Sequence, residues 1–331
     1  MPVSAGGAIR SFIQLRGRIS VTGRLSRRAF VGLSAAAILS DAFARDAART
    51  RYSAHLGFQA YTVRAQLQEA PEETLRRVAA IGYREVELYQ PESASILAPL
   101  AAAHGVRVIG SHVPDLFPTP RAWPDWRSAG ESTIPPGLDL QEILLIARTH
   151  GLTLLGYASG APVEAYVDEE SYRAYARLLD RIGARCRAAG VSFVYHNHRR
   201  EFAAIGGRTY FDVLAAATDP DHVGFEVDVC WAAQGGRDPA ALISQLRGRV
   251  PAIHLKDRTA AIAPSALAEL AQNDERRIVA EVGRGTLDIR GILLAARGAG
   301  VRHVFVEQDF SAGDPVDSLA ASYAYVRGLG L

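Results

Sequence analysis

Residues 252–257 read Ala-Ile-His-Leu-Lys-Asp, an apolar run that ends in imidazole, ammonium and carboxylate side chains. The same form returns at 191–198 (Val-Ser-Phe-Val-Tyr-His-Asn-His), 223–228 (Val-Gly-Phe-Glu-Val-Asp) and 301–309 (Val-Arg-His-Val-Phe-Val-Glu-Gln-Asp). Short apolar runs of this kind are typical of strands buried on both faces of a parallel sheet. The polar groups that follow them indicate a site at the carboxyl ends of those strands.

Outward from these stretches, eight apolar runs alternate with amphipathic stretches of helical period. The runs predict strands at Leu56–Ala60, Val86–Leu88, Val106–Ile109, Leu152–Gly156, Val191–Tyr195, Val223–Val227, Ala252–Leu255 and Val301–Val306. The intervening stretches predict helices at Pro71–Ile81, Ser93–His104, Leu138–His150, Glu170–Ala189, Tyr210–Ala217, Pro239–Leu246, Ile289–Gly298 and Pro315–Leu329. Glycines typical of helix C-termini follow several of these stretches, at Gly82, Gly105, Gly151, Gly190 and Gly300. Eight such units favour an α/β protein with a closed (β/α)₈ TIM barrel over an open doubly wound sheet.

Two features of the connections leave alternatives open. Ile278–Val282 could form a further short strand, so a nine-stranded or broken barrel is not excluded. The connections Val113–Gly137 and Asp257–Asp288 are long, and both follow strand C-termini, where barrel enzymes build their sites. The first connection is rich in Pro and Trp and is either a semi-rigid lid over a pocket or a packed surface loop.

The N-terminal segment has the features of an export signal. Residues 1–28 contain no Asp or Glu, a twin arginine precedes the apolar run Val31–Leu39, and Ala42-Phe43-Ala44 has small-x-small form. The run is too short for a spanning helix, which needs about 20 residues. We predict a twin-arginine signal peptide over 1–44, a linker over 45–54 and a single barrel domain over 55–331. The protein would then be periplasmic, with no membrane segment after signal removal; a lipid anchor or a buried helix is the alternative.

Charge and cysteine content narrow the possible partners. Lys and Arg number 37 against 35 Asp and Glu, a formal net charge of +2, which gives no electrostatic reason to expect nucleic acid or an anionic membrane. Cys186 and Cys230 match no zinc motif and fall in different layers of the expected fold. We therefore expect no disulfide between them.

Polar residues at the ends of the last four predicted strands form a candidate metal site. They are His196, Asp228, His254 and Glu307, spaced by one βα unit each. Adjacent strand ends converge on the barrel axis, so the four side chains can reach one ion. Two imidazoles and two carboxylates suit Mn²⁺, Co²⁺, Zn²⁺ or Fe²⁺, with Mg²⁺ less favoured. The alternative is that they cap the barrel through hydrogen bonds alone.

Further side chains are expected beside that ion. His198 and Glu87 should flank the same pocket, and Lys256 shares the facing of His254 because strand side chains alternate with period two. Lys256 could neutralise an enolate oxygen or hold a hydroxyl, or could form a salt bridge with a neighbouring carboxylate. Trp231 could offer an apolar face to a sugar ring or pack at the rim.

The loop Gly283-Arg-Gly-Thr286 is only superficially similar to a phosphate-binding loop and is better explained as a turn. No basic cluster accompanies it, so a phosphorylated substrate has no support in the sequence.

Several motifs together resemble the sugar phosphate isomerase/epimerase family with the xylose isomerase-like barrel. They are Phe58-Gln-Ala-Tyr-Thr-Val-Arg64, His196-Asn-His198 followed by Glu201-Phe202, Asp228-Val-Cys-Trp231, His254-Leu-Lys-Asp257 and Val306-Glu-Gln-Asp309. The resemblance runs from about His55 to the C-terminus. It implies a divalent metal held by residues of the last four strands, which are the same four positions, and substrate contact by Tyr61 in the first motif. Ketose epimerases of this family carry Glu where this chain has His196, so their two-carboxylate proton shuttle is incomplete here.

The chemistry expected from this set is metal-assisted proton transfer next to a carbonyl. We predict an isomerase or epimerase that acts on a sugar or keto-sugar through an enediolate, with Glu307, His198 or His112 as the base. The alternatives are a lyase or dehydratase on a keto-sugar, keto-inositol or 3-keto-glycoside, and a periplasmic carbohydrate-binding barrel without turnover. A metal-dependent phosphodiesterase resembling endonuclease IV is disfavoured by the balanced charge and the export signal. Only a small carbohydrate is expected as partner, with a homo-oligomer left open.

Overall fold

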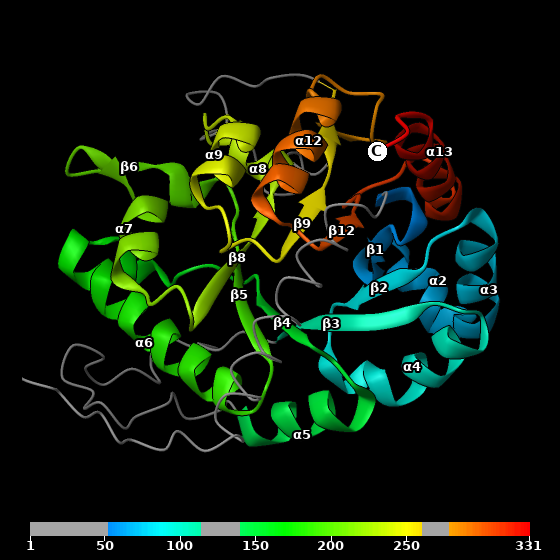
Figure 1. Ribbon diagram of the computed structural model, residues 1–331, viewed down its shortest axis with the longest axis horizontal. Helices are drawn as coiled ribbons and strands as arrows, with labels where there is room; N and C mark the ends of the chain where they lie inside the picture. The colour runs from blue at the N-terminus through cyan, green and yellow to red at the C-terminus, as the bar shows by residue number, and fades with distance from the viewer. Residues whose placement is uncertain (1–51, 114–139, 260–277) are drawn as a thin grey trace, which may run out of the picture. The chain divides into compact units, whose positions relative to one another are not determined.

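Eight parallel strands close into a barrel in the computed structural model, which describes residues 52–113, 140–259 and 278–331 (Figure 1). Around the barrel the strands are β1 (Gly57–Gln59), β2 (Glu85–Leu88), β3 (Arg107–Val113), β4 (Leu154–Tyr157), β5 (Ser192–His196), β8 (Val223–Asp228), β9 (Ala252–Leu255) and β12 (His303–Val306). Each overlaps one predicted strand. The prediction of a (β/α)₈ TIM barrel is confirmed.

Helices cover the outside of the barrel (Figure 1). They are α2 (Arg64–Glu69), α3 (Pro71–Ile81), α4 (Ala94–Ala103), α5 (Leu140–His150), α6 (Glu169–Ala188), α7 (Tyr210–Ala217), α8 (Val229–Gln234), α9 (Pro239–Gln245), α12 (Ile289–Ala299) and α13 (Pro315–Gly328). Short 3₁₀ helices occupy Tyr52–Ala54, Ala60–Val63, Pro91–Ser93, Val163–Tyr166 and Arg200–Phe202. Helices α2 and α8 were not predicted, because six residues are too few to show a helical period.

Capping side chains determine where several helices begin. The carboxylate of Asp168 accepts a hydrogen bond from the Ser171 backbone N–H at the start of α6, at 2.7 Å. At α7, Thr209 and Asp212 form a reciprocal capping box. Asp314 caps α13, with Pro315 as its first residue. Each such cap is worth about 1 kcal/mol, so the helix starts are encoded locally.

Closure of the barrel depends on a glycine in β1. Gly57 pairs with Phe305 of β12 and with Glu85 of β2. A Cβ atom on Gly57 would lie 2.5 Å from the Phe305 ring, well inside contact distance. Only glycine therefore lets the first strand approach the last.

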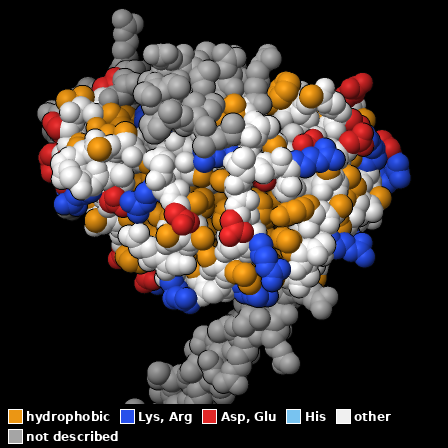
Figure 2. Space-filling model, turned by 90° about the horizontal axis from the view of Figure 1, so that it is seen from above, with side chains coloured by type: hydrophobic (Ala, Val, Ile, Leu, Met, Phe, Trp, Pro, Cys, Tyr) orange, Lys and Arg blue, Asp and Glu red, His pale blue; other side chains and the backbone are white. Residues whose placement is uncertain are grey.

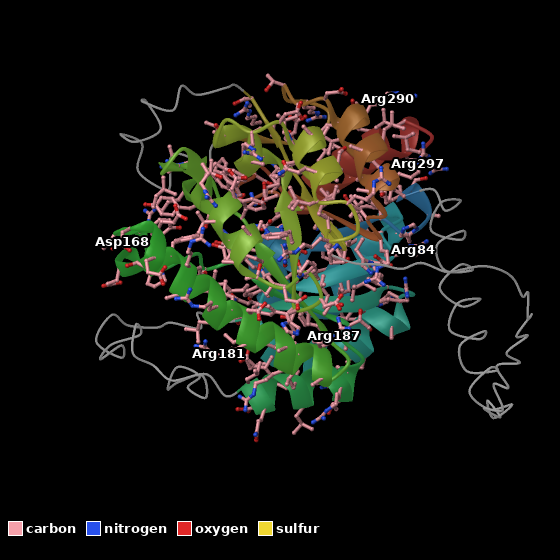
Figure 3. All side chains as sticks on the ribbon, turned by 60° about the vertical axis from the view of Figure 1, so that its left-hand side comes forward. Arg84, Asp168, Arg181, Arg187, Arg290 and Arg297 are labelled. Carbon is pink, nitrogen blue, oxygen red and sulfur yellow. The ribbon has the colours of Figure 1, made fainter. Side chains whose placement is uncertain are left out.

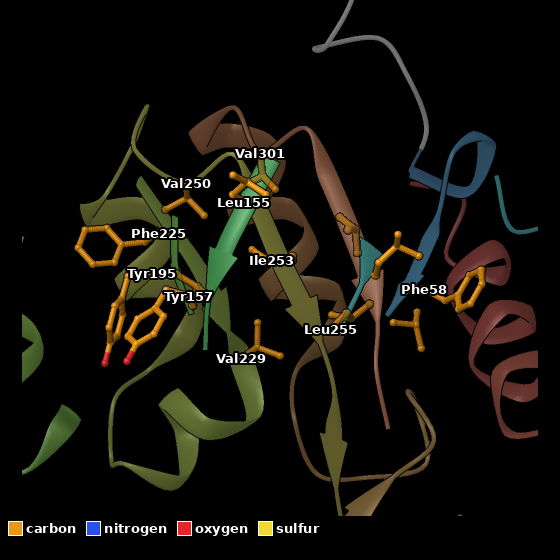
Figure 4. Close-up of a cluster of buried hydrophobic side chains, with 14 of the residues drawn as sticks. Phe58, Leu155, Tyr157, Tyr195, Phe225, Val229, Val250, Ile253, Leu255 and Val301 are labelled. Atoms are coloured by element: carbon orange, nitrogen blue, oxygen red, sulfur yellow. The ribbon is translucent and has the colours of Figure 1, made fainter. Parts of the chain in front are cut away.

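The strands bury two different faces. Their outward side chains pack under the helices in the main core, which includes Tyr195, Phe225, Ile253 and Leu255 (Figure 4). A second, separate apolar cluster consists of inward-facing Ile109, Leu154, Val194, Ala252 and Phe305. Because strand side chains alternate, the next inward positions along these strands are available for polar residues above this apolar floor.

The possible ninth strand lies outside the barrel. Val279–Ala280 (β11) pairs antiparallel with Asp257–Arg258 (β10), beyond the end of β9. A second small hairpin joins β6 (Ala204–Ile205) to β7 (Arg208–Thr209). Residues near Ile278–Val282 are thus extended, as the sequence allowed, but the barrel keeps eight strands.

The described surface carries mixed charges. Arg181 and Arg187 of α6 are among the charged side chains on the outer helices (Figure 3), and the face in Figure 2 intersperses acidic, basic and hydrophobic groups. Among the described helices, none combines the length and apolar character that a membrane span requires. Both cysteines are buried and free, as predicted. The predicted signal, residues 1–44, and most of both long connections lie outside the described residues.

Candidate metal centre and active site

The mouth of the barrel holds the four predicted metal ligands. His196, Asp228, His254 and Glu307 each offer one ligand atom, and these atoms lie within 4.8 Å of one another; we call this set the mouth quartet. His254 Nδ1 lies 2.6 Å from Glu307 Oε2, and His196 Nε2 lies 3.8 Å from Asp228 Oδ2. All four side chains are buried. Nitrogen and carboxylate donors at these separations fit a divalent transition-metal ion.

Asp228 is held in place by its own helix and by β5. Its Oδ1 accepts the Trp231 backbone N–H at 2.8 Å and caps α8, while Oδ2 faces the site, 3.1 Å from Lys256 Nζ and 3.8 Å from His196 Nε2. The amide of Asn197 bonds both the N–H and the C=O of Asp228, at 3.1 and 3.2 Å. The ends of β5 and β8 are thus fastened together. The second oxygen is thus held at the site, where a carboxylate can serve as a ligand to a cation.

Lys256 is buried among three carboxylates. Its Nζ lies 2.8 Å from Asp309, 2.9 Å from Glu307 and 3.1 Å from Asp228. Burial opposes the charge, but these carboxylates outweigh it and hold the pKa of Lys256 well above its usual value. The side chain therefore stays an ammonium at neutral pH. Both alternatives considered for Lys256 remain compatible with this position, since the salt bridges lie beside the candidate metal.

A second layer of polar groups lies deeper in the barrel, on Glu87, His112 and Glu226. His112 Nε2 lies 3.0 Å from Glu226 Oε2 and 3.3 Å from Glu87 Oε2. His254 joins the two layers, because its Nε2 lies 2.7 Å from Glu87 and 3.2 Å from Glu226. Gly156 of β4 leaves room for them: a Cβ there would lie 2.8 Å from the His112 ring.

The two layers perturb His254 and its partners strongly. Burial disfavours the imidazolium, but Glu226 and Glu307 outweigh it and hold the pKa of His254 well above its usual value. For Glu307, burial is likewise outweighed, here by Lys256 and His254, so the pKa of Glu307 lies well below its usual value. Glu307 is thus a weak base in this arrangement.

His198 has the opposite character. Burial lowers its pKa, with Lys256 acting in the same direction and Glu201 against it, so the ring is neutral at pH 7. Glu201 also orients the turn, accepting the His198 backbone N–H at 3.0 Å and the Tyr195 hydroxyl at 2.7 Å. A neutral imidazole near an ammonium is suited to accept a proton.

Trp231 lies against both of these groups. Its ring centroid is 5.9 Å from that of His198 and 5.5 Å from Lys256 Nζ. The indole N–H is buried and makes no hydrogen bond. At the β1 end of the mouth, Tyr61 packs edge-on against Tyr89, with centroids 5.9 Å apart. Both predicted substrate contacts therefore follow strand ends, and their roles remain predictions.

The glycine loop at Gly283-Arg-Gly-Thr286 is a turn held by protein, not a phosphate cradle. The buried carboxylate of Asp257 accepts the backbone N–H groups of Gly283 and Gly285 at 3.0 Å each, and that of Leu287 at 3.1 Å. The donors that a phosphate would need are occupied by a side chain of the same chain.

Sequence reasoning omitted Glu226, Asp309 and Gln59 from the site. Glu226 could have been predicted from the sequence. It precedes Asp228 by two residues in the same strand, and side chains two residues apart point to the same face of a strand. Asp309 follows Glu307 by the same interval. The contact of Gln59 with Glu87, 2.7 Å between Nε2 and Oε2, has no signal in sequence spacing.

Comparison with known proteins identifies the family of this barrel. The model of the xylose isomerase-like TIM barrel family matches residues 75–328. An inosose dehydratase from Lacticaseibacillus casei is 33% identical over 92 residues, which cover 28% of this chain and 30% of that protein. The aligned stretch thus spans under a third of that relative's length.

Solved structures share the fold at low identity. A sugar phosphate isomerase/epimerase from Parabacteroides distasonis is similar with a TM-score of 0.65 and 21% identity, covering 82% of this chain and 93% of that chain. A D-psicose 3-epimerase from Clostridium cellulolyticum is similar with a TM-score of 0.57 and 12% identity, covering 83% and 99%. The family model covers well over half of the sequence, and the observed barrel agrees with it. The chain belongs to the xylose isomerase-like TIM barrel family.

Proposed function

We propose that the mouth of this barrel removes a proton next to the carbonyl of a polyhydroxylated ketone, with a divalent metal at His196, Asp228, His254 and Glu307. The observation that carries the proposal is that His198, whose pKa is lowered, and Lys256, whose pKa is raised, both lie against the ring of Trp231 at the edge of that ligand set. A divalent ion held there would act as a Lewis acid toward the carbonyl and the enolate.

In this proposal His198 is the general base. Its neutral ring takes the α-proton, while the Lys256 ammonium stabilises the negative charge that develops on the enolate oxygen. Lys256 holds its own proton too firmly to act as an acid. Trp231 covers the sugar face and can donate its unpartnered N–H to a hydroxyl. Glu307 serves as a ligand, because its lowered pKa makes it a poor base.

The enediolate can then be converted to product in two ways. Reprotonation at the other carbon or face gives the isomerisation or epimerisation predicted from the sequence. Departure of a β-oxygen substituent, with His198 returning the proton to it, gives elimination.

We favour elimination. His196 stands where ketose epimerases of the family carry a carboxylate, so a second carboxylate base across the substrate is missing. A similar protein from Lacticaseibacillus casei is an inosose dehydratase. A single base that both accepts and returns one proton is sufficient for elimination. We propose a keto-sugar, keto-inositol or 3-keto-glycoside as substrate, and export would expose the protein to glycosides outside the cytoplasm.

The test is incubation of metal-loaded protein with keto-sugars, inososes and 3-keto-glycosides in deuterated water, followed by NMR. Elimination predicts an unsaturated ketone that has lost its β-substituent. Isomerisation or epimerisation predicts a product that keeps all its substituents and contains deuterium from the solvent. His198→Gln should lose both, by about 10²–10⁴-fold. His222→Gln is the matched control, since His222 pairs with Asp180 on the outer surface at 3.1 Å. No proton exchange with any ketone, despite bound metal, would contradict the proposal.

A further inference from the structure

The deep layer has the geometry of a cation site in its own right. His112 Nε2, His254 Nε2 and His196 Nδ1 lie 3.0, 3.2 and 3.5 Å from one atom, Glu226 Oε2. A tetrahedral ion with bonds of about 2.0–2.1 Å keeps its ligand atoms roughly 3.3–3.4 Å apart. One ligand atom from each of these four side chains lies within 4.8 Å of the others, and we call this set the deep quartet.

Hydrogen bonding alone does not account for this arrangement. Three ring nitrogens face one carboxylate oxygen, which has two lone pairs, while Glu226 Oε1 is buried and makes no hydrogen bond. His196 Nδ1 and Glu87 Oε1 are also buried without a hydrogen bond. All three atoms belong to side chains that are almost fully inaccessible. Buried polar atoms are nearly always satisfied, so several in one place call for a missing partner.

The number of buried carboxylates also favours a cation in the deep layer. Five carboxylates lie together at the mouth and in the deep layer with Lys256 as the accompanying ammonium, namely Glu87, Glu226, Asp228, Glu307 and Asp309. Buried charges require partners of opposite sign. Lys256 does not contact Glu226 and Glu87 in the described structure, and the basic groups beside these two carboxylates are the imidazoles of His112 and His254, which could exchange their protons for a divalent ion.

The two quartets share two imidazoles and use opposite sides of each. His254 faces Glu307 with Nδ1 and Glu226 with Nε2. His196 faces Asp228 with Nε2 and Glu226 with Nδ1. A neutral imidazole has one nitrogen lone pair to give, so a ring that binds an ion on one side offers an N–H on the other. Simultaneous filling would require both rings to lose a further proton.

We propose that the barrel has a second, deeper cation position, made by His112, His196, Glu226 and His254, which is filled in alternation with the mouth position. Three nitrogen donors and one carboxylate in tetrahedral arrangement select zinc or cobalt over magnesium and calcium. An ion in the deep position turns the N–H sides of His196 and His254 toward the mouth. It therefore excludes metal from the mouth quartet.

Each position has two ligands of its own, which makes the proposal testable. His112 and Glu226 belong only to the deep quartet, and Asp228 and Glu307 only to the mouth quartet. Asp228→Asn keeps the capping oxygen for α8, because Asn is an equally good N-cap. Glu226→Gln and His112→Gln keep size while removing a ligand. His303→Gln is the control, since His303 pairs with Glu85 at the opposite end of the barrel, at 2.8 Å.

The experiment is titration of metal-free protein with Co²⁺, followed by visible absorption and by metal content after gel filtration. Tetrahedral cobalt absorbs more strongly than cobalt with five or six ligands. We assign the strong band to the deep position, because in the proposed function an ion at the mouth would also take oxygen atoms of water or substrate as ligands. We expect Asp228→Asn and His303→Gln to keep about one equivalent and the strong band. Glu226→Gln and His112→Gln should lose the band yet keep cobalt at the mouth, and Asp228→Asn/Glu226→Gln should bind none.

Other patterns of cobalt binding would separate the deep position from the mouth position. Loss of all cobalt from Asp228→Asn, with full binding in Glu226→Gln, overturns the deep position and leaves the proposed mouth metal intact. Survival of the strong band in both Glu226→Gln and His112→Gln also overturns it. Two equivalents in the unaltered protein would overturn alternation. A band unaffected by Asp228→Asn, with no cobalt left in Glu226→Gln, supports the deep position and contradicts the mouth metal of the proposed function.

Discussion

Replacement of Lys256 by Met tests the charge arrangement at the mouth most directly. The change removes the ammonium and leaves three carboxylate groups, those of Asp228, Glu307 and Asp309, close together and without their common partner. Removal of one partner from a buried ion pair costs about 3–5 kcal/mol. Met fills a similar volume, so little of the loss should come from a cavity. For a domain of this size we expect the melting temperature to fall by roughly 5–9 °C in metal-free protein.

The pH dependence of that loss has a definite sign. The pKa of Glu307 in the folded protein lies well below its usual value, with Lys256 the leading favourable cause against burial. Its stabilising effect is present above the unfolded pKa and is lost as pH falls through the folded pKa. Without Lys256 the folded pKa of Glu307 would rise, with His254 still opposing burial, and the pKa of Asp228, which burial already raises against Lys256, would rise further. The variant should therefore recover stability as pH falls from 8 to 5. Over this range, protonation of the Glu307 carboxylate should change the stability of the unaltered protein little.

A divalent ion should restore part of the lost stability. It supplies positive charge to Asp228 and Glu307, and an ion at 100 times its dissociation constant stabilises the folded state by about 2.7 kcal/mol. The assay is thermal unfolding by circular dichroism at pH 5, 6.5 and 8, with chelator and with Mn²⁺ or Zn²⁺. Arg76→Met is the control, because Arg76 and Glu73 are both more than half exposed and the loss of their ion pair should cost about 1 kcal/mol or less. A metal-free Lys256→Met protein as stable as this control at pH 8 would refute the reasoning.

Three further predictions concern the metal and its surroundings. The pKa of His254 is raised, because Glu226 and Glu307 outweigh burial, so metal binding must displace its proton; metal affinity, measured with a competing chelator, should rise about tenfold per pH unit between pH 6 and 8, and equal affinities across that range would contradict this. Gly156→Ala places a methyl 2.8 Å from the His112 ring and 3.3 Å from Glu226 Oε2; it should weaken cobalt binding in the deep position at least tenfold while binding at the mouth changes little, and an unaltered cobalt band would count against it. Asp257→Ala leaves the backbone N–H groups of the Gly283–Leu287 turn without their acceptor; we expect a loss of about 3 kcal/mol in the free energy of unfolding by urea, with metal content unchanged, and a loss below about 1 kcal/mol would show that the turn is satisfied in another way.

The residues at the strand ends are the part of the candidate site that could be predicted from the sequence. Each strand of the barrel is short and mainly apolar, and each of the four mouth residues lies within one residue of the carboxyl end of its strand. Residues His196, Asp228 and His254 could therefore be placed together before the fold was known, since parallel neighbours end at one edge. Helix starts were also readable, because caps such as Asp168 and Thr209 act within three residues.

The second layer could not be read in this way. Glu87 and His254 lie 167 positions apart, yet their side chains approach to 2.7 Å inside the barrel. His112 reaches them from a strand whose pairing with β2 shifts register between Val86 and Glu87, so its inward depth is not set by local sequence. The pairing of Lys256 with Asp309 depends on the course of the chain after β12.

The sequence by itself determined the periodic part of this protein: eight strands, the main helices between them, and four candidate metal ligands at the strand ends. Only the tertiary structure decided which inward side chains meet across the barrel, that Glu226 faces three histidines, and that Lys256 stays charged. The physical reason is the range of the interactions. Hydrophobic periodicity and caps act within a few residues, whereas register and closure of the barrel determine the depth at which distant side chains meet and the charges that they face there.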